Sequence, residues 1–132
     1  MVLVVDDDRD IRELVLTLLH LRGVEAIGVT TGIDALRLLT VGDLPRPEIV
    51  LLDIQMPELD GWDTLRMIRA RPDLAAVRVI LCTVKGQPAD IERARKLGAD
   101  GYVMKPFVVD DVVREIARVR GLKPSTVSDS PL

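Results

Sequence analysis

Short apolar runs alternate with amphipathic stretches five times along this chain, and this alternation limits the folds open to it. The apolar runs cover residues 2–5, 26–29, 50–53, 79–82 and 101–104. The stretches between them carry apolar residues at helical spacing, for example Ile11, Leu14, Val15 and Leu18, and then Ile33, Leu36 and Leu39. Since right-handed crossovers join parallel strands through helices, the pattern predicts an α/β fold with a doubly wound, five-stranded parallel sheet and five helices.

The run Val50–Asp53 is the centre of this pattern. It is continuously apolar until it ends in a carboxylate, and the turn-rich stretch Gln55–Gly61 follows it. A run of this kind is typical of a strand buried on both faces of a sheet. Ligands bind at the carboxyl ends of the strands in open α/β sheets, so we expect Asp53 to lie at a binding edge.

Polar residues mark where several of the helices begin. Asp8 stands immediately before the first helical stretch, Thr31 before the second and Asp60 before the third. Short side chains with an oxygen acceptor are favoured at the N-cap because they accept a hydrogen bond from a free backbone N–H. We therefore interpret these three residues as helix caps.

Composition restricts the classes of protein to which the chain can belong. Its 132 residues, 48% of them hydrophobic, suffice for one domain, which we place at residues 1–121. From Leu122 the apolar periodicity is lost, so residues 122–132 are predicted to be a disordered tail or the start of a linker. A formal charge of −3 without a basic stripe argues against direct nucleic-acid binding.

The sequence also indicates the cellular compartment of the protein. No stretch reaches the roughly 18 apolar residues of a membrane span, and the chain does not start with a signal-peptide pattern. Cys82 is the single cysteine, which excludes a disulfide within the chain. We expect a cytoplasmic protein that does not contact membranes.

Chemistry-bearing side chains follow four of the five predicted strands. These residues are Asp6, Asp7, Asp53, Thr83 and Lys105. If the first and third strands are neighbours, three carboxylates converge, and their mutual repulsion calls for a positive partner. Mg²⁺ is suited to this position because it prefers carboxylate oxygens, several waters and a phosphate oxygen.

The other two residues complete a phosphate site. Lys105 supplies a point charge and Thr83 a hydroxyl donor, and both could contact the same phosphate. The set therefore favours phosphoryl transfer to a carboxylate, with Asp53 as the nucleophile. Taken alone, Asp6 and Asp7 are as consistent with helix capping as with function. Tyr102 taken alone is more typical of core packing, but its place shortly before Lys105 favours a functional role.

Four stretches of the sequence resemble the receiver domain of two-component response regulators. They are Leu3–Asp7, Leu52–Gly61, Thr83 and Gly101–Phe107. They occur in order at predicted strand ends, and the resemblance extends over nearly all of residues 2–121. It implies a flavodoxin-like sheet with strand order 2-1-3-4-5.

The resemblance also implies roles for these residues. Asp53 would accept a phosphoryl group from a phosphohistidine on a sensor histidine kinase or phosphotransfer protein. Mg²⁺ would be held by Asp7, by Asp53 and by the backbone carbonyl of Gln55, with Asp6 acting mainly through water. Lys105 would pair with the phosphoryl group.

A switch is the expected output of such a domain. Thr83 would move to bind the phosphoryl group and Tyr102 would turn inward behind it, which would reshape the surface of the fourth helix, fifth strand and fifth helix for an unknown output partner. The domain would catalyse only its own phosphorylation and dephosphorylation. The bond between Lys105 and Pro106 is expected to be cis.

Some positions depart from the family pattern or vary within it. Val84 stands where relatives usually carry a small residue, so its bulk would hinder access to the phosphoryl site or limit the movement of Thr83. Gln55 and Lys85 occupy positions that tune the lifetime of the phosphoryl group in relatives.

Three other functions can be compared with that of a phosphorylated receiver domain. A receiver-like module that binds partners without being phosphorylated is consistent with Val84 but not with the intact acid cluster. A phosphatase of the haloacid dehalogenase kind would need a second aspartate where the chain has Gln55. A nucleotide-binding protein is disfavoured because the turn after the first strand lacks phosphate-cradling glycines.

Overall fold

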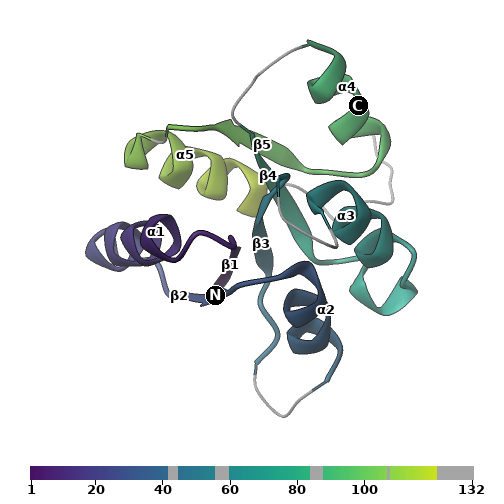
Figure 1. Ribbon diagram of the computed structural model, residues 1–132, viewed down its shortest axis with the longest axis horizontal. Helices are drawn as coiled ribbons and strands as arrows, with labels where there is room; N and C mark the ends of the chain where they lie inside the picture. Colours follow the sequence, from purple (N-terminus) through teal and green to yellow (C-terminus); the bar gives the residue numbers. More distant parts are fainter. Residues whose placement is uncertain (42–44, 56–59, 84–87, 107, 122–132) are drawn as a thin grey trace.

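The computed structural model describes residues 1–41, 45–55, 60–83, 88–106 and 108–121 (Figure 1). The strands are β1 (Val2–Val5), β2 (Ala26–Val29), β3 (Ile49–Asp53), β4 (Arg78–Thr83) and β5 (Gly101–Met104). The helices are α1 (Arg9–Leu21), α2 (Gly32–Thr40), α3 (Gly61–Arg69), α4 (Pro88–Lys96) and α5 (Val109–Arg120), with a short 3₁₀ turn at Pro72–Leu74.

All five strands form one sheet in the order β2-β1-β3-β4-β5, and every neighbouring pair is parallel. The predicted fold class and strand order are therefore confirmed. β1 pairs with β3, which the site prediction required, and Asp53 lies opposite Cys82 across the β3–β4 pair. The carboxyl ends of the strands thus meet at one edge.

Helices cover both faces of the sheet. Figure 1 shows α1 and α5 on one side of the strands and α2, α3 and α4 on the other. Each face has its own apolar core: Val15, Leu19, Val112 and Ile116 fill the first, and Ala35, Leu39, Leu65 and Ile68 the second. Every residue of β1 and β3 is buried, as expected for central parallel strands.

The three predicted caps are confirmed. Asp8 accepts a hydrogen bond from the Ile11 N–H at 3.1 Å. Thr31 and Asp60 do the same at the starts of α2 and α3, at 3.1 and 2.9 Å. The caps fix where α1 and α3 begin relative to the strand ends, and therefore where the residues before them stand.

Two of the apolar residues at helical spacing are exposed. Leu14 is 58% exposed and Ile33 44% exposed, whereas Leu19 and Ala35 are buried. The apolar stripe on each helix is wider than the strip that the sheet covers, so residues at its margin remain in contact with solvent.

The outer edge of β5 is partly covered by α5. Glu115 Oε2 accepts the Tyr102 N–H at 3.0 Å, and Arg118 Nη2 donates to the Asp100 carbonyl at 2.7 Å. A Cβ atom on Gly101 would lie 2.9 Å from Arg118 Nη2, so the glycine leaves room for this contact. The two α5 side chains thus form hydrogen bonds with backbone groups that would otherwise face solvent.

The predicted tail, residues 122–132, lies outside the described residues. None of the helices in the described ranges is long and apolar enough to cross a bilayer.

Candidate functional site

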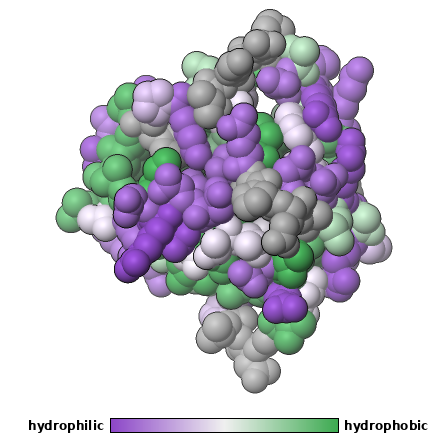
Figure 2. Space-filling view, viewed as in Figure 1, coloured by the Kyte–Doolittle hydropathy of each residue, from purple (hydrophilic) through white to green (hydrophobic). Residues whose placement is uncertain are grey.

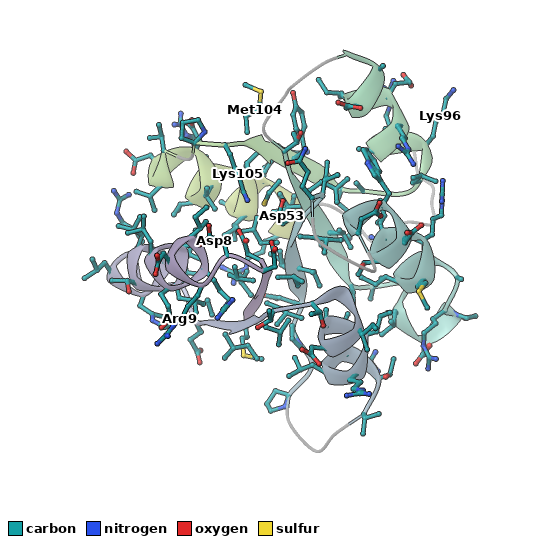
Figure 3. All side chains as sticks on the ribbon, in the orientation of Figure 1. Asp8, Arg9, Asp53, Lys96, Met104 and Lys105 are labelled. Carbon is teal, nitrogen blue, oxygen red and sulfur yellow. The ribbon has the colours of Figure 1, made fainter. Side chains whose placement is uncertain are left out.

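The ends of β1, β3 and β5 bring three acidic residues and one lysine together. Lys105 Nζ lies 3.1 Å from Asp6 Oδ2 and 3.1 Å from Asp53 Oδ2. One carboxylate oxygen each from Asp6, Asp7 and Asp53 lies within 4.8 Å of the others. Asp53 and Lys105 stand side by side near the centre of Figure 3. Four of the predicted site residues therefore form one cluster.

The two inner carboxylates are buried and held at both oxygens. Asp6 is 4% exposed and Asp53 6% exposed. Their Oδ2 atoms contact Lys105, while Asp6 Oδ1 accepts the Asp8 N–H at 2.9 Å and Asp53 Oδ1 accepts the Gln55 N–H at 3.1 Å. Asp7, by contrast, is exposed. The cluster thus has a closed inner side and an open outer side.

Burial and charge act against each other in this cluster. Burial raises the pKa of Asp53, Asp6 raises it further, and Lys105 offsets only part of the increase. Burial also opposes the charged form of Lys105, but Asp53 and Asp6 outweigh it and raise the pKa of that ammonium. Asp53 therefore gains from any added positive charge, while Lys105 remains a cation.

The turn after β3 depends on a glycine. The Gly61 N–H donates to the Ile54 carbonyl at 2.9 Å, and a Cβ atom on Gly61 would lie 2.5 Å from Ile54 Cα and in steric conflict with the Asp53 carbonyl. Since these are backbone atoms, only glycine permits this approach. The start of α3 is thereby packed directly against the backbone of Asp53 and Ile54.

Thr83 and Tyr102 lie on the other side of the site. Both line a small apolar cavity of about 10 Å³ beneath α4, together with Ile91 and Ala94. The Thr83 carbonyl accepts the Lys105 N–H at 2.7 Å, and the bond between Lys105 and Pro106 is cis, as predicted. Thr83 and Tyr102 are therefore neighbours, each half-buried.

Some sequence predictions fall outside what the structure describes. Val84 and Lys85 belong to the undescribed stretch 84–87. Gln55 is exposed and its N–H bonds Asp53, while the role of its carbonyl remains a prediction. Cys82 is buried directly behind the site, and burial raises the pKa of its thiol, so it acts as a small apolar residue.

Sequence reasoning missed two contacts around the cluster. Arg12 Nη1 donates to the Asp6 carbonyl at 2.9 Å, and the Arg93 guanidinium stacks 4.2 Å from the centre of the Trp62 ring. The Arg12 contact depends on the conformation of the turn between β1 and α1, and the Arg93 contact depends on how α3 and α4 are placed in the finished fold. Sequence spacing alone therefore gave no signal for either contact.

The donor set fits a hard divalent cation. Three carboxylates converge, they outnumber the one ammonium that the described residues place beside them, and one of them is open to solvent. Oxygen ligands of this kind, with room for water, are what Mg²⁺ requires.

The face seen in Figure 2 is largely hydrophilic, with apolar patches on the side of α1 and α5.

A family model described as "Response regulator receiver domain" matches residues 2–117. This chain belongs to that family. The receiver domain of two-component response regulators is a signalling family rather than a family of enzymes with separate substrates. The prediction made from the motifs is confirmed, and the match favours it over the haloacid dehalogenase alternative.

Curated relatives of this receiver domain are longer than the chain. A probable transcriptional regulator, ycf27, of Cyanophora paradoxa is 38% identical over 121 residues, which cover 92% of this chain and 47% of the relative. The DNA-binding response regulator MtrA of Mycobacterium tuberculosis is 35% identical over 120 residues, covering 90% and 50%. The chain spans about half the length of the curated relatives it matches.

A solved structure of the same fold holds a metal. The receiver domain of the sensor histidine kinase PA1611 from Pseudomonas aeruginosa is 28% identical, with a TM-score of 0.79 over 92% of this chain and 97% of that one. Its crystal structure has a magnesium ion coordinated in the active site cleft.

Proposed function

We propose that Asp53 is the phosphoacceptor of this receiver domain and takes a phosphoryl group from a phosphohistidine in a Mg²⁺-dependent reaction. The supporting observation is the position of its carboxylate, which is buried at the end of β3 between Lys105 and two further aspartates. A carboxylate oxygen of Asp53 attacks phosphorus, the P–N bond breaks, and the imidazole leaves. Lys105 balances charge on the phosphoryl oxygens.

The proposed metal ligands are those that the family resemblance implies, and the acid cluster is compatible with them. Asp7 is exposed and Asp53 belongs to the same acid cluster, so both serve as ligands together with the Gln55 carbonyl. Asp6 and Asp53 are each bonded at both oxygens, and the family resemblance assigns Asp6 the role that acts mainly through water. When bound, Mg²⁺ offsets the repulsion among the acids and the transferred group. The magnesium-containing PA1611 receiver supports this assignment.

Phosphorylation would act on the Thr83 side of the site. The Thr83 hydroxyl donates to the phosphoryl oxygens and draws Tyr102 inward, which changes the surface of α4, β5 and α5. The partners are a sensor histidine kinase or phosphotransfer protein on the input side and an output domain or protein at this surface. The domain itself catalyses only its own phosphorylation and dephosphorylation, in the cytoplasm, without direct contact to nucleic acid or membrane.

Labelling with acetyl phosphate tests the proposal. Intact-mass analysis should show one added phosphoryl group on the wild-type chain in the presence of Mg²⁺, and none after chelation or in Asp53→Asn. Asp60→Asn is the matched control, because it alters an acid that caps α3 in the same segment and should leave labelling intact.

Two outcomes would contradict the assignment. Labelling that survives in Asp53→Asn would place the phosphoryl group elsewhere. A folded wild-type chain that binds Mg²⁺ but is never labelled would instead favour a receiver-like module that only binds partners.

A further inference from the structure

Arg12 extends from α1 back toward the end of β1. Its Nη1 donates to the Asp6 carbonyl at 2.9 Å, and its own N–H bonds the Asp8 carbonyl at 2.9 Å. Helical side chains lean toward the N-terminus of their helix, so the first turns of α1 naturally aim a long side chain at the preceding turn. The guanidinium therefore spans the turn that carries Asp6 and Asp7.

A missing side chain on β2 makes room for the stem of Arg12. A Cβ atom at Gly28 would stand 3.0 Å from Arg12 Cδ and 3.1 Å from Arg12 Cγ. Gly28 lies opposite Val4 in the β1–β2 pair, one strand away from the turn that the guanidinium reaches. The stem thus lies over an edge strand at a position where any larger residue would displace it.

Arg12 completes the restraint of Asp6. The Asp6 N–H donates to the Val29 carbonyl at 3.2 Å, and its two carboxylate oxygens bind the Asp8 N–H and the Lys105 ammonium. The carbonyl that Arg12 binds belongs to the planar peptide unit joining Asp6 to Asp7. Fixing that oxygen fixes the plane from which Asp7 departs.

Asp7 needs such a restraint from its backbone. Its side chain is exposed, and within the described part of the chain its carboxylate makes no hydrogen bond or ion pair of its own. Its Cα–Cβ bond, and so the region that its carboxylate can reach, is therefore positioned by the backbone, including this peptide plane, rather than by side-chain contacts. Arg12 is the side chain that holds this plane.

We propose that Arg12 is a positioning residue for metal binding: by holding the Asp6 carbonyl, it aims the Asp7 carboxylate at the Mg²⁺ site. The inference rests on the proposed function. It gives Arg12 no contact with metal or phosphoryl group, and Gly28 is required because it admits the Arg12 stem.

Calorimetric Mg²⁺ titration of the full chain tests this role, with the acetyl phosphate labelling rate measured across Mg²⁺ concentrations. Arg12→Gln and Arg12→Lys should each weaken Mg²⁺ binding about tenfold, the usual scale for residues that orient metal ligands. Saturating Mg²⁺ should restore the labelling rate, because the machinery at Asp53 is unchanged.

Arg9 provides the matched control. It is an exposed arginine in the first turn of the same helix, and Figure 3 shows it pointing away from Asp53 and Lys105. Arg9→Gln removes the same charge and should leave Mg²⁺ affinity within about twofold of wild type, since exposed charges are strongly screened. Gly28→Ala should weaken binding in the same direction as Arg12→Gln, by about threefold, because it displaces the stem while keeping every site residue.

The variants distinguish a positioning role of Arg12 from an effect of its charge and from an effect on the stability of the fold. Wild-type affinity in both Arg12 variants would overturn the inference, as would full rescue by Arg12→Lys, which would show that charge alone matters. A loss of thermal stability without a loss of Mg²⁺ affinity would also overturn it. If Arg12→Gln does not fold, Arg12→Lys and Gly28→Ala decide. A wild-type chain that binds no Mg²⁺ would count against the proposed function instead.

Discussion

The two halves of the site differ in how firmly they are held. Asp6 and Asp53 stand at the ends of β1 and β3, whose residues are all buried, and their carboxylates are bonded at both oxygens. On the other half, Ala94 is the one buried side chain among those that the structure describes in α4. The acid cluster is therefore built rigidly, while the helix beside Thr83 and Tyr102 is free to move at low cost.

The contact between Arg93 and Trp62 compensates in part for this weak packing. Trp62 is the residue after Gly61 in α3. The Arg93 guanidinium of α4 lies 4.2 Å from the centre of the Trp62 ring. The cavity beneath α4 holds only about 10 Å³, about the minimum that one water needs. Further inward movement of Tyr102 must therefore be matched by movement of α4.

A large effect, of the same order as the loss of a core side chain, is expected on the rigid side from Gly61→Ala. The new Cβ would collide with the backbone at Asp53 and Ile54, and such overpacking should lower the free energy of unfolding by about 2–4 kcal/mol. Urea denaturation measures this. Gly121→Ala is the control, since its Cβ would meet its nearest neighbour at 3.5 Å. Equal stability of the two variants would show that the start of α3 adapts freely.

Matched truncations compare the two halves directly. Leu81→Ala removes a fully buried side chain from β4 and should cost about 2–5 kcal/mol, while Ile91→Ala on α4 should cost about 1 kcal/mol because Ile91 is half-buried. Both values come from denaturant unfolding under the same conditions. Similar losses would show that α4 is as tightly packed as the sheet.

The free energy of unfolding should depend on pH because the Asp53 carboxylate is buried. Because burial raises the pKa of Asp53, the folded chain binds that proton more tightly than the unfolded chain does. Without Mg²⁺, stability should fall as pH rises through this pKa, and Asp53→Asn should be more stable than wild type near neutral pH. The difference should shrink on acidification. Thermal unfolding in chelator measures it, and a less stable Asp53→Asn would contradict the prediction.

The smallest effect is expected from Arg93→Gln, which removes the cation–π contact and should cost about 0.5–1 kcal/mol. Amide hydrogens of α4 should exchange faster while those of β3 are unchanged. Arg95→Gln on the same helix is the control, because among the described residues its exposed side chain pairs only with Glu92, one turn away. Equal exchange in both variants would remove Arg93 as an anchor of α4.

Features that follow from local sequence or from the topology of a parallel sheet could be predicted, and individual side-chain contacts outside those rules could not. Asp8 and Asp60 were identified as caps because a cap depends on the next few residues. Asp53 and Lys105 were placed together because parallel strands end at one edge. Leu14 shares the helical spacing of the apolar residues but is exposed, because that spacing does not say how much of a helix the sheet covers. Arg12 gave no signal because its contact depends on the turn at Asp6.

The cover that α5 places over β5 has a consequence for behaviour in a crowded solution. An unprotected border strand can recruit a strand from another molecule and start a fibril. Glu115 and Arg118 already hold the backbone at Tyr102 and Asp100, so such recruitment is opposed along the first part of β5. A protein that has to expose neighbouring surface to signal can therefore do so without becoming prone to polymerise there.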